Sequence, residues 1–254
     1  MDPTAHPEIN DVLHRLLQGV RPILESQFVG MYLYGSLALG DFQPGRSDVD
    51  FVVVTEGPPG QETVARLESL HEELGRRREK WWHKLEGAYV PRSVLRRHDE
   101  RHPPVPTLNE GRFYLSPLGA DWIIQRHVLR EAGVVLAGPP PRTLIDPVPP
   151  QMIPDAVRDV LRQWWEPMLN EPSVLRRPGY QPFAVLSMCR ALYTLRTGQL
   201  ASKSSAAAWA VDVLPEEWHD LIARAQRWRD GEPIAGVERT LAFMRYVVAE
   251  SRRS

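Results

Sequence analysis

The hydrophobic pattern of the first half of the chain alternates between helical and extended periods. Apolar residues three and four positions apart predict an amphipathic helix near the N-terminus. A short apolar run at residues 29–34 predicts a buried strand, a second run at 48–54 predicts a central strand, and residues 64–74 predict another helix. The residues on the apolar side of the first helix are Ile9, Val12, Leu13, Leu16, Leu17, Val20, Ile23 and Leu24.

The second half of the chain has apolar residues at helical spacing throughout. Its first stripe repeats at three and four residues, and similar stripes cover residues 183–196, 204–213, 216–228 and 236–249. This pattern predicts an all-α bundle. The residues of the first stripe are Val157, Val160, Leu161, Trp164, Trp165 and Met168.

A proline-rich segment separates the two halves. Residues 137–154 contain seven prolines, which should prevent both a helix and a central strand there. We interpret the segment as an interdomain connector and predict an α/β (α+β) domain with a small mixed sheet at 1–150. An all-α domain should follow at 151–254.

Candidate chemistry lies around the first two predicted strands. The first strand ends at Gly35-Ser36, and Ser36 should open a short helix whose free N–H groups can hold a polyphosphate. Asp48 and Asp50 should project from one face of the next strand, because side chains alternate along a strand. Two such carboxylates repel each other unless a cation lies between them, and magnesium satisfies this requirement. The alternative is an aspartate that caps the strand or pairs with Arg46.

The Gly35-Ser36 and Asp48-Val49-Asp50 pattern resembles that of the polymerase-beta-type nucleotidyltransferases. More narrowly, the chain resembles the streptomycin/spectinomycin adenylyltransferases of aminoglycoside resistance, and this likeness covers nearly its whole length. The narrower likeness is carried by residues 122–140, by Cys189-Arg190-Ala191-Leu192-Tyr193, by residues 197–203 and by Ala208-Trp209-Ala210.

The resemblance implies roles for further residues. It makes Glu86, on a plausible third strand at 84–90, the general base and a metal ligand beside Asp48 and Asp50. The alternative is an edge-strand glutamate that pairs with Lys84 or Arg92. Phosphates of ATP are expected on Gly35, Ser36, Ser47 and Lys203, with Arg190 as a second cation and Trp228 near the nucleotide. Lys203 and Arg190 could instead be ordinary surface or ion-pair residues, and Trp228 could be core.

Composition and charge limit the kinds of partner that the protein is expected to bind. The chain has 31 basic and 32 acidic residues and a formal charge of −1, so nucleic-acid binding is not expected. A single cysteine excludes an internal disulfide framework and suits a reducing cytoplasm. Neither a membrane span nor a secretory leader is expected. We expect a cytoplasmic monomer that uses ATP and two Mg²⁺ ions.

Three hypotheses for function follow. The first is an aminoglycoside adenylyltransferase. The second is the same nucleotidyl transfer to a protein side chain, a tRNA end or a metabolite. The third is an inactive nucleotide-binding regulator, which would have no physical need for three converging acids. The resemblance implies acidic residues that grip a cationic drug just upstream of the Arg190 helix, but Arg176 and Arg177 stand in that region.

Overall fold

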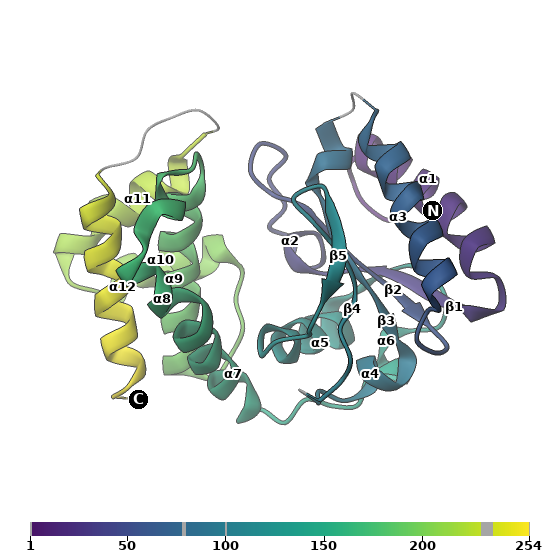
Figure 1. Ribbon diagram of the computed structural model, residues 1–254. Coiled ribbons are helices and arrows are strands. Elements are labelled where there is room, and N and C mark those ends of the chain that lie inside the picture. The colour runs from purple at the N-terminus through teal and green to yellow at the C-terminus, as the bar shows by residue number, and fades with distance from the viewer. Residues whose placement is uncertain (1, 78–79, 100, 230–235, 254) are drawn as a thin grey trace. The chain divides into compact units, whose positions relative to one another are not determined.

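The structure, a computed structural model, describes residues 2–77, 80–99, 101–229 and 236–253. It divides into two compact units. The first comprises Met1–Phe42 and Ser47–Pro147, and the second comprises Gln43–Arg46 and Val148–Ser254. Figure 1 shows that strands belong to the N-terminal part of the chain and that the C-terminal part is helical. The predicted fold class is therefore confirmed.

The first unit is built on a six-stranded mixed sheet with the order β5-β4-β3-β2-β1-β6. Strands β2 and β3 run parallel, and the other neighbouring pairs are antiparallel. β2 is thus an interior strand, as its apolar run predicted. The strands are β1 (Phe28–Leu33), β2 (Val49–Thr55), β3 (Leu85–Pro91), β4 (Val105–Asn109), β5 (Arg112–Ser116) and β6 (Val134–Ala137).

Helices cover both faces of this sheet (Figure 1). The apolar side of α1 packs with α3 and with alternate residues of β1, β2 and β3 in one buried core. On the other face α2 and α4 contact β2, and α5 contacts α2. The helical segments of this unit are α1 (Pro7–Leu24), η1 (Glu25–Gln27), α2 (Gly35–Ala38), α3 (Gln61–Gly75), η2 (Lys80–Lys84), α4 (Arg92–Arg96), α5 (Asp121–Ala132) and α6 (Pro141–Leu144).

The second unit consists of helices, of which α9 is the central one. It contacts α7, α10, α11 and α12. Its buried side chains occupy nearly every direction around the helix axis, as expected of a helix surrounded by others. The segments are α7 (Met152–Val160), η3 (Leu161–Trp165), α8 (Glu166–Asn170), η4 (Pro172–Arg176), α9 (Tyr180–Thr197), α10 (Lys203–Val213), η5 (Glu216–Trp218), α11 (His219–Arg227) and α12 (Val237–Ser251).

The proline-rich segment departs from the sequence prediction. It was expected to exclude helix, but α6 begins at Pro141 and α7 includes Pro154. Both prolines lie in the first turn of their helix, where a backbone N–H has no partner within the helix and its loss costs nothing.

Two further differences concern elements that local patterns describe poorly. The β4–β5 hairpin was not predicted; its tight turn places Glu110 and Gly111 at positive φ, which is typical of a type I′ hairpin turn. The prediction that Trp164 lies on the apolar side of its helix was also wrong, because this residue is 55% exposed. Residues 161–165 form a π turn, and the wider turn shifts the helical phase.

Candidate active site

The candidate site starts at the interior parallel strands of the first unit. Asp50 and Glu86 are direct register partners across β2 and β3. Residues in register on parallel neighbours project to the same face, and adjacent strands lie about 4.8 Å apart. The sheet therefore sets these two carboxylates side by side, on the face opposite the α1–α3 core.

Gly35 lies directly against one of these carboxylates. Its φ is +62°, a left-handed value that favours glycine, and a Cβ built on it would overlap the Asp50 carboxylate. The N–H of the preceding residue, Tyr34, donates to the Asp50 carbonyl at 3.2 Å. Glycine at the first position of α2 is thus required by the close approach of the Asp50 side chain. Ser36 follows in the first turn of α2 and is half-buried.

Asp48 lies one position before β2, which begins at Val49. Its carboxylate Oδ1 is 3.2 Å from Lys84 Nζ, and the two side chains are 42% and 35% exposed. The cation on Asp48 is therefore Lys84, not the Arg46 considered from the sequence. Ser47, immediately before it, is half-buried.

The cations that the sequence suggested for Glu86 make ion pairs with other acids. Of the two cations suggested as its partners, Lys84 pairs with Asp48 and Arg92 pairs with Glu56 at 3.5 Å. Glu86 is half-buried. Its strand, β3, lies beside the aspartate strand as the sequence predicted.

Tyr34 was not among the predicted site residues, although it directly precedes Gly35. It is 7% exposed, and its ring centroid lies 6.2 Å from that of Trp122. Burial raises the pKa of the Tyr34 phenol well above its ordinary value, and the negative charges of Asp50, Glu86 and Asp121 raise it further. The phenol therefore keeps its proton at neutral pH.

Asp121, the first residue of α5, is the third acid near Tyr34. Desolvation raises the pKa of its carboxyl, although the residue as a whole stays open to solvent, and the N–H groups of Asp121 and Trp122 lower that pKa in part. The contact between α2 and α5 brings Asp121 near Tyr34, and residues so far apart in sequence give no local signal of this proximity.

The carboxylates fit a magnesium ion in number and chemistry. Among the described residues, no three His, Cys, Asp or Glu side chains are arranged as a preformed metal cluster. Mg²⁺ does not need one, because one or two carboxylates, substrate phosphates and water complete its octahedron. Asp50 and Glu86, adjacent in register, supply such a pair, and Asp48 lies two residues before Asp50.

The predicted nucleotide-binding cations lie in the second unit. Lys203 is the first residue of α10, and its Nζ lies 4.2 Å from the centroid of the Phe183 ring. Phe183 and Arg190 are seven residues apart in α9 and therefore lie on the same face of that helix. Lys203 Nζ therefore lies against the face of α9 that also carries Arg190.

Trp228 belongs to the same unit and is 8% exposed. Its ring lies next to Gly179, whose φ of +77° begins the turn into α9: a Cβ there would be 3.0 Å from the Trp228 ring. Arg176 and Arg177 precede this turn and are exposed. The burial of Trp228 fits the core alternative that the sequence left open.

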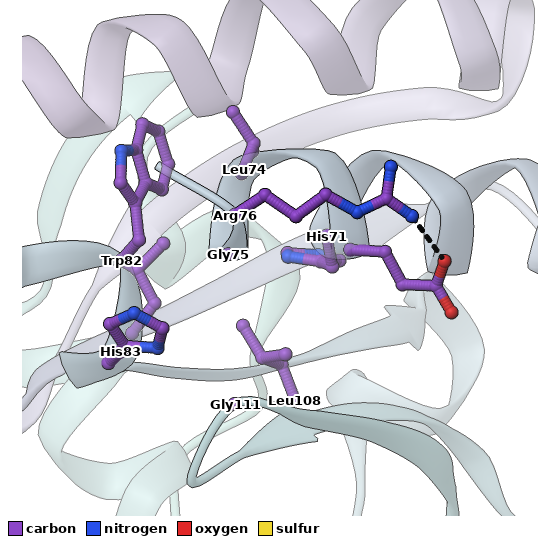
Figure 2. Close-up of a pocket in the computed structure, with 10 residues that line it drawn as sticks. His71, Leu74, Gly75, Arg76, Trp82, His83, Leu108 and Gly111 are labelled. Carbon is purple, nitrogen blue, oxygen red and sulfur yellow. Dashed lines mark ion pairs between the residues drawn. The ribbon is translucent and has the colours of Figure 1, made fainter. Parts of the chain in front are cut away.

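A cavity of about 390 Å³ lies elsewhere in the first unit, between α3, η2 and the β4–β5 turn (Figure 2). Its lining includes Trp82, Leu85 and the buried His71. His71 Nε2 lies 2.8 Å from the Tyr89 hydroxyl, and burial lowers the pKa of His71 to about 4. Because Leu85 and Glu86 are consecutive in β3, the cavity and the carboxylate pair are on opposite faces of the sheet.

A mixed sheet that pairs two carboxylates beside a Gly-Ser turn is suited to nucleotidyl transfer, and comparisons with known proteins agree with that class. Residues 17–99 match the model of the nucleotidyltransferase domain. Residues 143–250 match the model described as "aminoglycoside adenylyltransferase, C-terminal domain". Together these matches support the aminoglycoside adenylyltransferase family, which the sequence motifs predicted.

Individual relatives cover most of the chain. It is 25% identical over 243 residues to an aminoglycoside (3'') (9) adenylyltransferase of Escherichia coli, covering 87% of this chain and 84% of the relative. It is 26% identical over 230 residues to a spectinomycin 9-adenylyltransferase of Staphylococcus aureus, covering 85% and 83%.

The fold itself is similar to a solved structure. The crystal structure of spectinomycin adenyltransferase AAD(9) from Enterococcus faecialis, determined with ATP and spectinomycin, superposes with a TM-score of 0.77. The match covers 95% of this chain and 98% of that one at 17% identity. This likeness concerns the fold alone. Among the described residues of this chain, no helix combines the length and apolarity that crossing a bilayer requires.

Proposed function

We propose that the protein transfers AMP from Mg-ATP to a hydroxyl group of a streptomycin- or spectinomycin-like antibiotic and releases pyrophosphate. The observation that carries this proposal is the in-register pair of Asp50 and Glu86 on parallel strands, with Gly35 held against Asp50. An adenylyl-transfer site needs a concentration of negative ligands and a base beside a phosphate-binding turn. Family membership supports the same chemistry.

In this proposal the residues of the first unit carry the chemistry. Asp48, Asp50 and Glu86 would hold two Mg²⁺ ions, which when bound neutralise phosphate charge and acidify the attacking hydroxyl. Glu86 accepts the proton of that hydroxyl. The oxygen of the acceptor hydroxyl then forms a bond to the α-phosphorus, while the bond from that phosphorus to the bridging oxygen of pyrophosphate breaks.

Other residues position the nucleotide. The turn at Gly35 and Ser36, together with Ser47, provides N–H and hydroxyl donors for the phosphates. Lys203 and Arg190 contribute positive charge to the triphosphate. Trp228, which is buried, would act on the nucleotide only through the packing of its own unit.

One observation favours a second candidate for the acceptor. Arg176 and Arg177 are exposed in the region where the family resemblance implies acids. Like charges lower the affinity for a polycationic drug. The same transfer to a less cationic acceptor is the alternative, with the protein acting as a cytoplasmic monomer in either case.

The experiment that tests the proposal is a mass-spectrometric search for an added AMP group. The protein is incubated with ATP, Mg²⁺ and, in separate reactions, spectinomycin, streptomycin and a panel of other aminoglycosides. Adenylylated antibiotic and pyrophosphate are expected from the wild type. Glu86→Gln is the matched control, because the amide keeps the shape of the side chain but cannot accept the proton. ATP bound without transfer to any compound in the panel would favour the other acceptor.

A further inference from the structure

One side chain at the carboxylate site has no place in the mechanism above. Lys84 is the last residue of η2, directly before β3, and Asp48 directly precedes β2. The register pair Val49–Leu85 places them opposite each other, one step before Asp50 and Glu86. The 3.2 Å contact between Lys84 Nζ and Asp48 Oδ1 is therefore set by the parallel pairing of the same two strands.

An ammonium group and a divalent cation compete for one carboxylate. We propose that Lys84 is a positioning residue: it is the resident counter-ion of Asp48 in the nucleotide-free protein and withdraws when a divalent cation binds there. The inference rests on the proposed function, because it takes Asp48 as a metal ligand. The ion pair makes binding of the metal alone weak. Binding of the metal together with nucleotide is stronger, since triphosphate oxygens offer the displaced ammonium a new partner.

The size of the effect follows from the exposure of the pair. Both side chains are more than a third exposed, so solvent screens their attraction and the ion pair itself contributes little. Repulsion between the lysine charge and the doubly charged ion is also screened by solvent, and it is comparable in size with that attraction. Removal of the ammonium should tighten binding of a divalent cation about three- to tenfold.

A purely structural ion pair would behave differently. If Lys84 only tied the start of β3 to the start of β2, its loss would lower stability slightly and leave metal affinity unchanged. Metal affinity in the absence of nucleotide therefore separates the two roles, and it does not depend on turnover.

The test measures free Mn²⁺ by electron paramagnetic resonance, with and without a non-hydrolysable ATP analogue. Lys84→Met removes the charge and Lys84→Arg keeps it. Lys80→Met is the matched control, because Lys80 belongs to the same short helix but its Nζ lies over the Trp81 ring at 4.6 Å. Asp50→Asn identifies the Mn²⁺ that binds at the carboxylates.

Without nucleotide, Lys84→Met should bind Mn²⁺ about three- to tenfold more tightly than the wild type, while Lys84→Arg and Lys80→Met should resemble the wild type. The gain in affinity on adding the analogue should be smaller in Lys84→Met. Unchanged or weaker Mn²⁺ binding in Lys84→Met, at a site that Asp50→Asn abolishes, would overturn the role of Lys84 alone. Absence of any Mn²⁺ site sensitive to Asp50→Asn, with the analogue present, would overturn the proposed metal site and this inference with it.

Discussion

The two faces of the β2–β3 pair differ sharply in chemical character. On one face Asp50 and Glu86 stand side by side, with Gly35 close by. On the other face their immediate chain neighbours, Phe51 and Leu85, are fully buried beneath α1 and α3. A step of one residue along a strand thus separates a set of charges from the centre of an apolar core.

The difference teaches that one pair of strands can supply rigidity and chemistry separately. The carboxylate face concentrates like charges, which is unfavourable for folding unless cations or donors compensate. The core face provides the apolar burial that holds the strands in register. Substitutions on the carboxylate face should therefore change activity, and substitutions on the core face should change stability.

The largest effect is expected from Asp50→Asn. An amide cannot replace the anionic ligand, so turnover should fall on the order of a thousandfold or more, while the free energy of unfolding should change by less than about 1 kcal/mol. Steady-state kinetics and urea denaturation measure the two quantities. Full activity in this variant would remove the metal-site interpretation of the carboxylate face.

Phe51→Ala probes the adjacent residue on the core face. Phe51 is fully buried, with its ring centroid 6.2 Å from that of His71 and 6.4 Å from that of Tyr89. Its truncation leaves a cavity and should lower the free energy of unfolding by about 3–5 kcal/mol. The fraction that remains folded should keep a KM for ATP near that of the wild type. A loss below about 1 kcal/mol would show that the core face is not what holds this strand pair.

The pH dependence of stability should come from the core face as well. The pKa of His71 is lowered to about 4 in the folded protein, whereas an unfolded histidine titrates near 6.5. The unfolded state therefore binds the extra proton first, and stability is complete above about pH 6.5 and lost as the pH falls toward 4, by up to about 3 kcal/mol.

Urea denaturation between pH 7 and 4.5 measures this loss. His71→Phe should flatten the dependence, and His14→Gln, which changes an exposed histidine of α1, should not. An unaltered slope in His71→Phe would assign the acid sensitivity to other groups.

The smallest effect is expected outside both faces, at Arg176 and Arg177. If these exposed arginines face the acceptor, changing both to Asp should lower the KM for streptomycin about three- to tenfold with little change for ATP, because repulsion acts on ground and transition states alike. Kinetics with both substrates measure this. Efficient adenylylation by the wild type, unaltered by the exchange, would mean that the arginines do not shape the acceptor preference.

Much of the carboxylate face could be predicted from sequence because its signals are local. Strand alternation placed Asp50 opposite Phe51, the Gly-Ser pair marked the end of β1, and the β3 prediction brought Glu86 to the neighbouring strand. The Lys84–Asp48 contact was missed because it depends on the register between two strands that are 36 residues apart in sequence. The proximity of Tyr34 and Asp121 was missed for a similar reason, since it depends on the packing of α5 against α2.

The sequence by itself determined the class of fold and the resemblance to a family, because periodicity and short motifs depend on residues a few positions apart. Only the tertiary structure decided that Asp50 and Glu86 are exact register partners, that Gly35 must lack a Cβ, and that Lys84 neutralises Asp48. It also decided that Lys203 lies over the Phe183 ring and that His71, whose pKa burial lowers, lies beneath β2 and β3. These features depend on strand register and helix packing, which arise from the collective burial of side chains distant in sequence.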